Sequence, residues 1–360
     1  MTQQGSTVDD QMATLTSPVD VTPSTTGSDM TSSSWSLQAS FYFEYAVIFI
    51  GVVGTAANAL ILYAMVVSKQ HRKYVLVFNQ NALDFCSCIF LIITYIVNLC
   101  NINFSGTLGY WLCMIIANET LIWSGITGSV INLEAVTVER YLKVVHDIWS
   151  KKKLRKWMVY MAAAFSWIGG FVYGLAVSFT TTAIIDGVCH AMVVWESDVA
   201  AVAHVIWNFV SFYVFMMLLF IFCYWRILAV VRRQARVMAG HAAAGPGTSH
   251  TQSNQIQTNI IKTMIFVSVF FAITWMPMKF HFFLAHFNYV SYSQASYYTV
   301  LFITLLYICA NPFIYAVKFD PVRKVLLGLI PCKKNTVEPV ASVQIATPSV
   351  AATGIAQTRM

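Results

Sequence analysis

The chain has 360 residues, of which 58% are hydrophobic and only 10% are charged. Soluble domains carry about 25% charged residues, so this composition excludes an ordinary water-soluble domain and indicates a protein surrounded by a lipid bilayer. The net charge of +7 does not by itself indicate a nucleic-acid partner, because the position of the basic residues carries more information than their sum.

The first 40 residues are rich in Ser, Thr and Asp and contain no Lys, Arg or Asn. They have no apolar core of the kind found in a cleaved signal peptide. We therefore expect residues 1–40 to form a disordered tail, and the first apolar run to serve as the signal anchor.

Seven apolar runs follow, each long enough for the roughly 20 residues that a helix needs to cross the hydrocarbon core. They cover residues 41–67, 76–100, 108–138, 158–179, 199–231, 260–287 and 297–317. The predicted fold class is all-α, a seven-transmembrane helix bundle over 41–318. A short amphipathic helix over 319–331 and a disordered tail over 332–360 are expected to follow it.

The basic residues determine the predicted orientation. Of the 22 Lys and Arg residues, 21 lie between runs one and two, between three and four, beside the connection from five to six, or after run seven. The positive-inside rule makes that side cytoplasmic. We therefore predict a multi-pass protein of the plasma membrane with an extracellular N-terminus and a cytoplasmic C-terminus. The exception is Lys279, inside run six.

Two cysteines are placed on the predicted outer side, where disulfides persist. Cys113 is at the outer end of run three and Cys189 is in the second outer loop, so a bridge between them would hold that loop over the mouth of the bundle. Cys100 is an alternative partner. Asn103 begins an Asn-Phe-Ser sequon in the first outer loop and is a candidate for glycosylation. Cys332, after the amphipathic stretch, is a candidate for palmitoylation, with a free thiol as the alternative.

Polar and helix-bending residues inside the runs are functional candidates. An ionisable group at bilayer depth costs about 2.5–3.5 kcal/mol on insertion scales, and Asp84 lies in the middle of run two. Its alternative role is a satisfied polar group between helices. Pro277 and Pro312 each remove a backbone hydrogen bond and permit a kink. Trp275 and Asn311 lie just before them.

Seven motifs, one in each predicted span, occur in a familiar order. They are Gly54 with Asn58; Asn81-Ala82-Leu83-Asp84; Glu139-Arg140-Tyr141; Trp167; Tyr224; Phe271, Trp275 and Pro277; and Asn311-Pro312-Phe313-Ile314-Tyr315. Through them, the chain resembles the rhodopsin-like family of G-protein-coupled receptors over residues 41–332.

The resemblance implies a receptor, not an enzyme. An extracellular ligand would favour a packing in which helix six swings outward at its cytoplasmic end and a heterotrimeric G protein docks against Arg140. Asp84, Ser129 and Asn311 match part of the family's sodium site, so an allosteric sodium ion is an expected cofactor. Tyr307, however, stands where members usually have a small polar residue. Phosphorylation of the C-terminal tail would recruit arrestin, and Thr358-Arg359-Met360 matches a PDZ ligand pattern.

Departures from the family pattern narrow the function. Leu305 replaces the lysine that binds retinal in opsins, and Ile122 replaces the aspartate of amine receptors, so neither light nor a biogenic amine is expected. Cys113 lies two residues further from the Glu139-Arg140-Tyr141 triplet than the family spacing. Run five contains no proline. Gln257 replaces the acid that often pairs with Arg140, which suggests a weak latch in the inactive state.

Helical spacing places an aromatic set with a few polar groups in the outer half of the bundle, as ligand pockets tend to have. The set is Tyr95, Asn98, Glu119, Trp123, Asn208, Lys279, Phe282 and Tyr297. Lys279 has two interpretations, a structural pair with Glu119 or a counter-charge for an acidic group of the ligand.

The set and the residues after the triplet loosely resemble peptide receptors of the galanin, allatostatin and somatostatin groups. A peptide ligand is therefore expected. The alternative function is an orphan seven-span receptor that acts as a constitutive or dimer-partner modulator without its own diffusible ligand.

Overall fold

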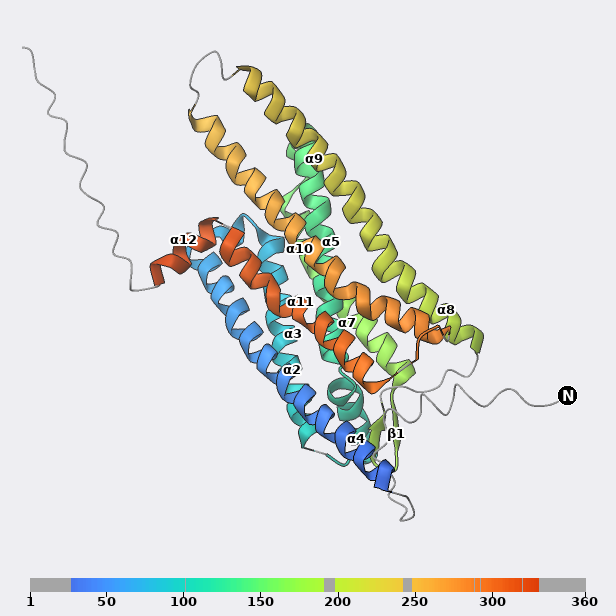
Figure 1. The fold of residues 1–360 in the computed structure, drawn as a ribbon. Coiled ribbons are helices and arrows are strands. Elements are labelled where there is room, and N and C mark those ends of the chain that lie inside the picture. The colour runs from blue at the N-terminus through green and yellow to red at the C-terminus, as the bar shows by residue number, and fades with distance from the viewer. Residues whose placement is uncertain are drawn as a thin grey trace, which may run out of the picture.

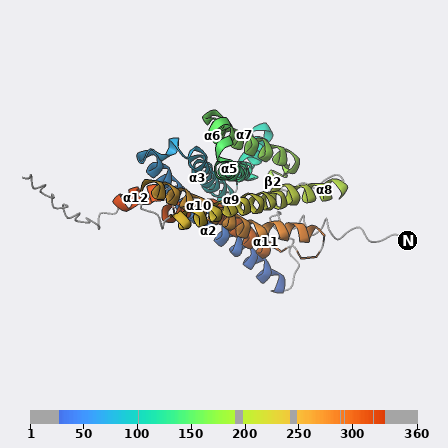
Figure 2. The same ribbon diagram turned by 90° about the horizontal axis from the view of Figure 1, so that it is seen from above.

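The computed structural model describes residues 27–100, 102–190, 198–241, 248–287, 289–291, 293–318 and 320–329. Residues 1–26, Cys332 and the C-terminal residues with the predicted arrestin and PDZ sites lie outside this part of the chain. The predicted fold class is confirmed, because seven helices in the described residues are long and apolar enough to cross a membrane. Figure 1 shows them side by side as one bundle, and Figure 2 shows α5 enclosed between α3, α7 and α9.

The helices that form the bundle agree with six of the seven predicted runs to within a few residues, apart from extensions at their ends. They are α2 (Gly27–Val67), α3 (Val75–Leu99), α5 (Thr120–Val145), α7 (Lys156–Thr181), α8 (Asp198–Phe209) continuing through η3 (Val210–Val214) into α9 (Phe215–His241), α10 (Thr248–His286) and α11 (Gln294–Lys318). Helix α2 begins well before residue 41, the predicted start of run one. The expected amphipathic helix after the last span is α12 (Asp320–Leu329), which packs against α11 and α2.

The bundle buries many polar side chains within its apolar core and exposes many large apolar ones on its outer surface, unlike a soluble domain. Asn58, Asp84 and Asn132 have no exposed surface, whereas Phe165 and Trp225 are 64% and 70% exposed. Hydrocarbon cannot hydrogen-bond, so polar groups must find partners within the bundle while apolar side chains face the lipid. This distribution supports the membrane assignment independently of helix length.

Glycines bring α5 and α7 into backbone contact. A Cβ added to Gly170 would lie 2.6 Å from the backbone nitrogen of Gly128, and one added to Gly128 would lie 2.8 Å from the carbonyl oxygen of Ser166. Small residues that allow such close approach are the usual basis of helix association in membranes, where the hydrophobic effect does not drive it. The α5–α7 interface is therefore the most tightly constrained helix pair in this bundle.

The third run is not one helix, which corrects the prediction of a continuous span over 108–138. The chain forms α4 (Gly106–Leu112), then a wider π-helical turn, η2 (Cys113–Ala117), and leaves the helix at Asn118 and Glu119. Glu119 adopts the left-handed conformation with φ of 56°. The wide turn and the break both lie between Cys113 and the triplet, the stretch that has two more residues than the family spacing.

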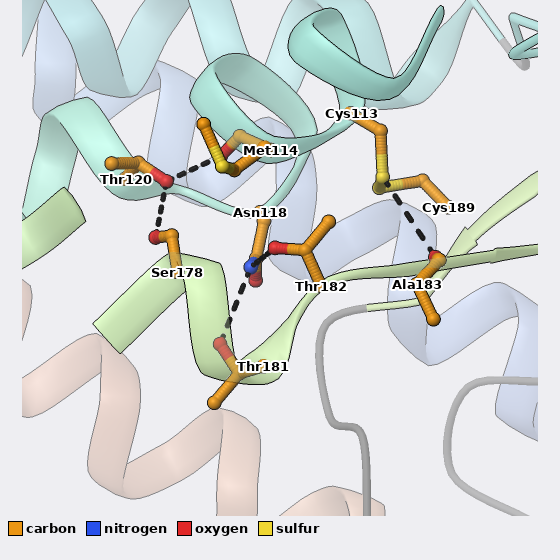
Figure 3. The surroundings of a disulfide bond; sticks show 9 residues. All are labelled: Cys113, Met114, Asn118, Thr120, Ser178, Thr181, Thr182, Ala183 and Cys189. Atoms are coloured by element: carbon orange, nitrogen blue, oxygen red, sulfur yellow. Dashed lines mark hydrogen bonds between the residues drawn. A yellow bond between two sulfur atoms is a disulfide. The ribbon is translucent and has the colours of Figure 1, made fainter. Parts of the chain in front are cut away.

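Side-chain hydrogen bonds hold this break in place (Figure 3). The amide of Asn118 donates to the hydroxyls of Thr181 and Thr182, and the hydroxyl of Thr120 bonds to the carbonyl of Met114 and to Ser178. The carbonyl of Met114 thus accepts from a side chain of α5, and the other bonds join the break to the last turns of α7 and to Thr182 after it.

A two-stranded hairpin, not foreseen from the sequence, occupies the loop after α7. Strand β1 (Ala183–Ile185) pairs antiparallel with β2 (Val188–His190), with Ile184 opposite Cys189. Asp186 and Gly187 make the turn with φ of 51° and 79°. An Asp-Gly pair between apolar residues is a strong hairpin signal, because this turn type needs positive φ at both positions.

The disulfide between Cys113 and Cys189 joins this hairpin to η2, which confirms the predicted pair. The alternative partner Cys100 is a free, exposed thiol. We call the end of the bundle that carries β1 and β2 the hairpin end. The opposite end, the α12 end, carries η1 (Gln70–Arg72) and α6 (Asp147–Lys153), since successive spans alternate in direction.

We predict that Gly170→Ala lowers the unfolding temperature of the purified protein, because the new methyl group must push apart two helix backbones. Overpacking of this kind costs about 1–3 kcal/mol, more than the roughly 1 kcal/mol of helix propensity gained. Gly169→Ala is the matched control, since its Cβ would meet only the tip of the Ile131 side chain and one ring carbon of Phe165. Equal unfolding temperatures for the two variants would contradict this account of the interface.

Candidate functional site

At the α12 end, Arg140 is buried without an acid from another helix among the described residues. Its Nη2 lies 3.4 Å from an oxygen of the neighbouring Glu139, whose other oxygen accepts from Lys143 at 2.5 Å. The guanidinium stacks over the ring of Tyr74 at 5.4 Å, while its Nε and Nη2 have no hydrogen-bond partner. A cation–π contact thus holds Arg140 in place of a salt bridge to another helix. The side chain of Gln257 lies outside the described residues.

Between this end and the middle of the bundle, Tyr224 links α9 to both of its neighbours. Its hydroxyl lies 3.1 Å from the Thr137 hydroxyl on α5 and 3.0 Å from the Ser268 hydroxyl on α10. Tyr141, the last residue of the triplet, is partly buried and packs against Phe222 of α9. The predicted Tyr224 therefore lies where a movement of α10 relative to α5 would be resisted.

An aromatic cluster fills the middle of α10. The ring of Phe271 lies 5.4 Å from that of Trp275 and 5.5 Å from that of Tyr307 on α11. Pro277 lies within α10 and Pro312 within α11, and α10 bends along its length in Figure 1. The predicted residues Phe271, Trp275 and Pro277 thus come together at a place where the α10 backbone lacks a hydrogen bond.

The helix of the fifth span contains a π-helical segment, η3, although it has no proline. Single-turn π segments are frequent at functional sites. Here Phe212, inside η3, stacks on Trp275 with the ring centroids 6.2 Å apart. The wide turn therefore places an aromatic side chain from the fifth span against the aromatic cluster of α10.

Asp84 is the centre of a fully buried polar network. Its two carboxylate oxygens accept from Ser129 at 2.6 Å and from Asn311 at 2.8 Å. Gln80 donates to Ser129 and accepts from Asn132 at 2.7 Å. The three predicted sodium-site residues are therefore adjacent. Sequence reasoning missed Gln80, which lies one helical turn before Asp84 and so on the same face of α3.

Tyr315 and Pro312 complete the predicted switch on α11. Both are buried, Tyr315 with 1% of its surface exposed. Asn58 donates to the carbonyl of Ile308 at 3.1 Å and so ties α2 to this helix. The segment from Asn311 to Tyr315 therefore lies between the Asp84 network and the α12 end.

Toward the hairpin end, Lys279 does not pair with Glu119, which corrects one of its two interpretations. The ammonium donates to the side-chain oxygen of Asn208 at 2.6 Å and lies over the rings of Phe212 and Trp275 at 5.1 and 5.2 Å. The ion pairs within the described residues involve Glu139 or Asp147, and none includes Lys279. The lysine is a partly buried cation surrounded by neutral groups.

Glu119 is held separately by two donors. The hydroxyl of Tyr95 donates to one carboxylate oxygen at 2.8 Å and the indole of Trp123 to the other at 3.0 Å. Its left-handed backbone at the break in the third span turns the side chain toward these two partners. The predicted outer set therefore divides into a cationic group around Lys279 and an anionic group around Glu119.

Ring contacts connect much of the rest of the set around the hairpin end. Tyr95 meets Phe43 at 6.0 Å, Phe43 stacks on Tyr298 at 4.3 Å, and Phe282 meets Tyr297 at 6.1 Å. Sequence reasoning missed Phe43, Tyr298 and also Tyr173, whose hydroxyl accepts from Asn208 at 2.6 Å. Asn98 is partly buried on α3. Asn103, the predicted glycosylation site, is exposed beside the hairpin turn at Gly187.

A separate apolar groove lies between the fifth span and α10. Its walls include Phe209, Tyr213, Phe280 and Phe283, and it contains none of the eight predicted ligand residues. Phe280 is 42% exposed, as expected for a surface covered by lipid.

Comparison with known proteins agrees with this arrangement. A family model described as "7 transmembrane receptor (rhodopsin family)" matches residues 57–315. The chain belongs to the rhodopsin family of seven-transmembrane receptors. The crystal structure of squid rhodopsin is similar to it with a TM-score of 0.65, covering 81% of this chain and 85% of that chain at 16% identity. At that identity, the similarity shows the fold alone. The search of curated proteins finds no match.

We predict that Lys279→Met leaves the unfolding temperature of this receptor unchanged or raises it by a few degrees. The substitution removes a partly buried cation that no anion of the described residues compensates, and methionine keeps most of the volume. Lys151→Met, which removes an exposed lysine paired with Asp147 at 2.7 Å, serves as the control and should have no effect. A fall of many degrees for Lys279→Met alone would show that the ammonium stabilises the fold.

Proposed function

We propose that this receptor binds an extracellular peptide with an acidic group and, when the peptide is bound, activates a heterotrimeric G protein. The observation that carries the proposal is the Lys279 cation, which lies among aromatic rings and neutral groups and has no carboxylate partner in the described part of the chain. A ligand carboxylate would supply the missing counter-charge, and such charge-assisted bonds are about twice as strong as neutral ones.

The second charge supports a peptide over a simple organic acid. Among the residues that the structure describes, the donors to Glu119 are the neutral groups of Tyr95 and Trp123. A ligand that carries both an acidic and a basic group would match Lys279 and Glu119 together, and peptides have both. The aromatic residues between these charges provide the apolar contact area that ligand sites in proteins have.

The proposed orientation puts the hairpin end outside the cell. The disulfide at that end requires an oxidising compartment to persist. The basic residues of α6, Lys151, Lys152 and Lys153, lie at the α12 end, which the positive-inside rule makes cytoplasmic. In this orientation the plasma membrane presents Lys279 to extracellular ligands and Arg140 to the G protein.

Shared contacts connect the two ends. Trp275 lies under the Lys279 ammonium and also contacts Phe271, which in turn contacts Phe220 of α9 and Tyr307 of α11. A ligand that draws Lys279 away from Asn208 would change the packing of Trp275. Physically, the ligand shifts the population toward the packing to which it binds more tightly.

A screen of synthetic peptides on cells that express the receptor with a promiscuous G protein tests the proposal. We expect at least one acidic peptide to activate the receptor. Lys279→Ala should abolish that response, whereas Lys279→Arg should retain part of it because the positive charge remains. Surface expression of each variant, measured with an epitope tag, is the control. A full response of Lys279→Ala would contradict the assignment. Basal signalling without a response to any peptide would favour the alternative of a constitutive modulator.

We also predict that Tyr74→Leu raises basal signalling, because the ring of Tyr74 holds Arg140 in the structure. Loss of a cation–π contact worth about 1 kcal/mol would change the equilibrium roughly fivefold. Tyr74→Phe keeps the ring and should leave basal signalling unchanged. Equal basal signalling in Tyr74→Leu and Tyr74→Phe would exclude the ring contact as a restraint on basal signalling.

A second variant changes Arg140's surroundings in the opposite sense. Gln257→Glu would add an acid for Arg140 and should lower basal signalling.

A further inference from the structure

The residues around Asp84 do not fit the sodium ion that the family resemblance implies. A hard cation such as sodium needs several oxygen lone pairs directed at it. Asp84 uses its oxygens to accept from Ser129 and Asn311. The Ser129 oxygen, the second expected sodium ligand, donates to Asp84 and accepts from the amide nitrogen of Gln80. An N–H group points at the oxygen that a cation would need.

The direction of the Gln80 amide follows from a chain of side-chain amides that has one consistent assignment. At its far end, the indole of Trp167, which only donates, bonds to the oxygen of Asn79 at 2.8 Å. The nitrogen of Asn79 then faces the oxygen of Asn132 at 2.8 Å. This indole N–H at one end of the chain of amides and the backbone carbonyl of Leu76 at the other end therefore set the direction of every amide between them.

The carbonyl is that of Leu76, which accepts from the nitrogen of Asn132 at 2.8 Å. The same nitrogen donates to the oxygen of Gln80 at 2.7 Å, so the nitrogen of Gln80 must face Ser129. Rotating the Gln80 amide to offer its oxygen to a cation would place two N–H groups against each other. The chain of amides thus keeps the Gln80 N–H, a hydrogen-bond donor, directed at Ser129.

Tyr307 lies beside this network. Its side chain is fully buried, and its hydroxyl lies 3.4 Å from the Gln80 nitrogen. The hydroxyl also lies beside Ser129 and Asn311. The side-chain oxygen of Asn311 is buried and has no hydrogen-bond partner among the described residues. The tyrosine therefore brings its own hydroxyl to the residues that would otherwise surround an ion.

We propose that the Tyr307 hydroxyl and the Gln80 amide replace the sodium ion in this receptor, so that the Asp84 network closes without a cation. The centroid of the Tyr307 ring also lies 5.5 Å from that of Phe271 and 6.5 Å from that of Trp275. Tyr307 therefore joins the polar network directly to the aromatic cluster of α10. The inactive packing is then independent of the sodium concentration.

Thermal unfolding of the purified full-length receptor tests this without any ligand. A ligand that binds only the folded state raises its unfolding temperature. The wild type should unfold at the same temperature in NaCl and in choline chloride of equal ionic strength. The double variant Tyr307→Ser, Gln80→Leu removes the ring, the hydroxyl and the amide donor, and should unfold a few degrees higher in NaCl. Adding Asp84→Asn should abolish that sodium effect.

Tyr307→Phe keeps the ring volume and is the folding control, with no sodium effect expected. A wild-type receptor that is stabilised by sodium, with the effect lost in Asp84→Asn, would overturn the proposal. A sodium-insensitive double variant would overturn it too, because the two side chains would then not be what excludes the ion. If the double variant does not fold, broadening of the ²³Na resonance by the wild-type protein, lost in Asp84→Asn, decides against the proposal, and its absence supports it.

Discussion

Hydrocarbon cannot donate or accept a hydrogen bond, and the arrangement of this receptor depends on that constraint. A polar side chain within the spans must be satisfied by its own helix, as Asn81 is by the carbonyl of Val77, or by another span. The contacts of the second kind specify which helices are neighbours. The Asp84 network joins α3, α5 and α11, and the amide chain from Gln80 to Trp167 extends it to α7. Helix α2 joins through Asn58. Five of the spans are thus connected by hydrogen bonds of polar side chains.

The remaining two spans are connected differently. The fifth span and α10 contact each other through aromatic rings, Phe220 and Phe271 among them, and through the hydrogen bond from Lys279 to Asn208. Asn208 also donates to Tyr173 of α7. Tyr224 adds two hydroxyl contacts. Ring contacts tolerate sliding better than directional hydrogen bonds do, and α10 also lacks a backbone hydrogen bond at Pro277. The structure therefore contains five spans joined by a polar network and a pair, the fifth span and α10, in which ring contacts are more prominent.

Much of this could be predicted from the sequence, and the failures have identifiable causes. Run length and the positions of Lys and Arg were enough for the seven spans, because the bilayer imposes a length on every helix. The break at Glu119 was missed because the hydropathy of a segment carries no information about its backbone dihedral angles. The hairpin at Asp186 and Gly187 had a recognisable turn signal that was overlooked.

Side-chain pairing was predicted less well than position. Lys279 and Glu119 were both expected in the outer half of the bundle, but helical spacing could not exclude a salt bridge between them. The break rotates Glu119 toward Tyr95 and Trp123, an effect that a regular helix would not produce. Likewise, the sequence motifs placed together the three residues Asp84, Ser129 and Asn311. The role of Gln80 was missed because it depends on the direction of its amide, which is set by contacts as far away as Trp167.

The backbone contact between Gly128 and Gly170 has a mechanical consequence. Helices that meet through side chains can shift by changing rotamers, but two backbones in contact have no rotamers to change. Helices α5 and α7 must consequently move as one rigid body, with Arg140 on it. Any rearrangement that uncovers Arg140 has to come from the helices that pack around this body. Such a movement is best described by the position of α10 relative to a fixed α5–α7 unit.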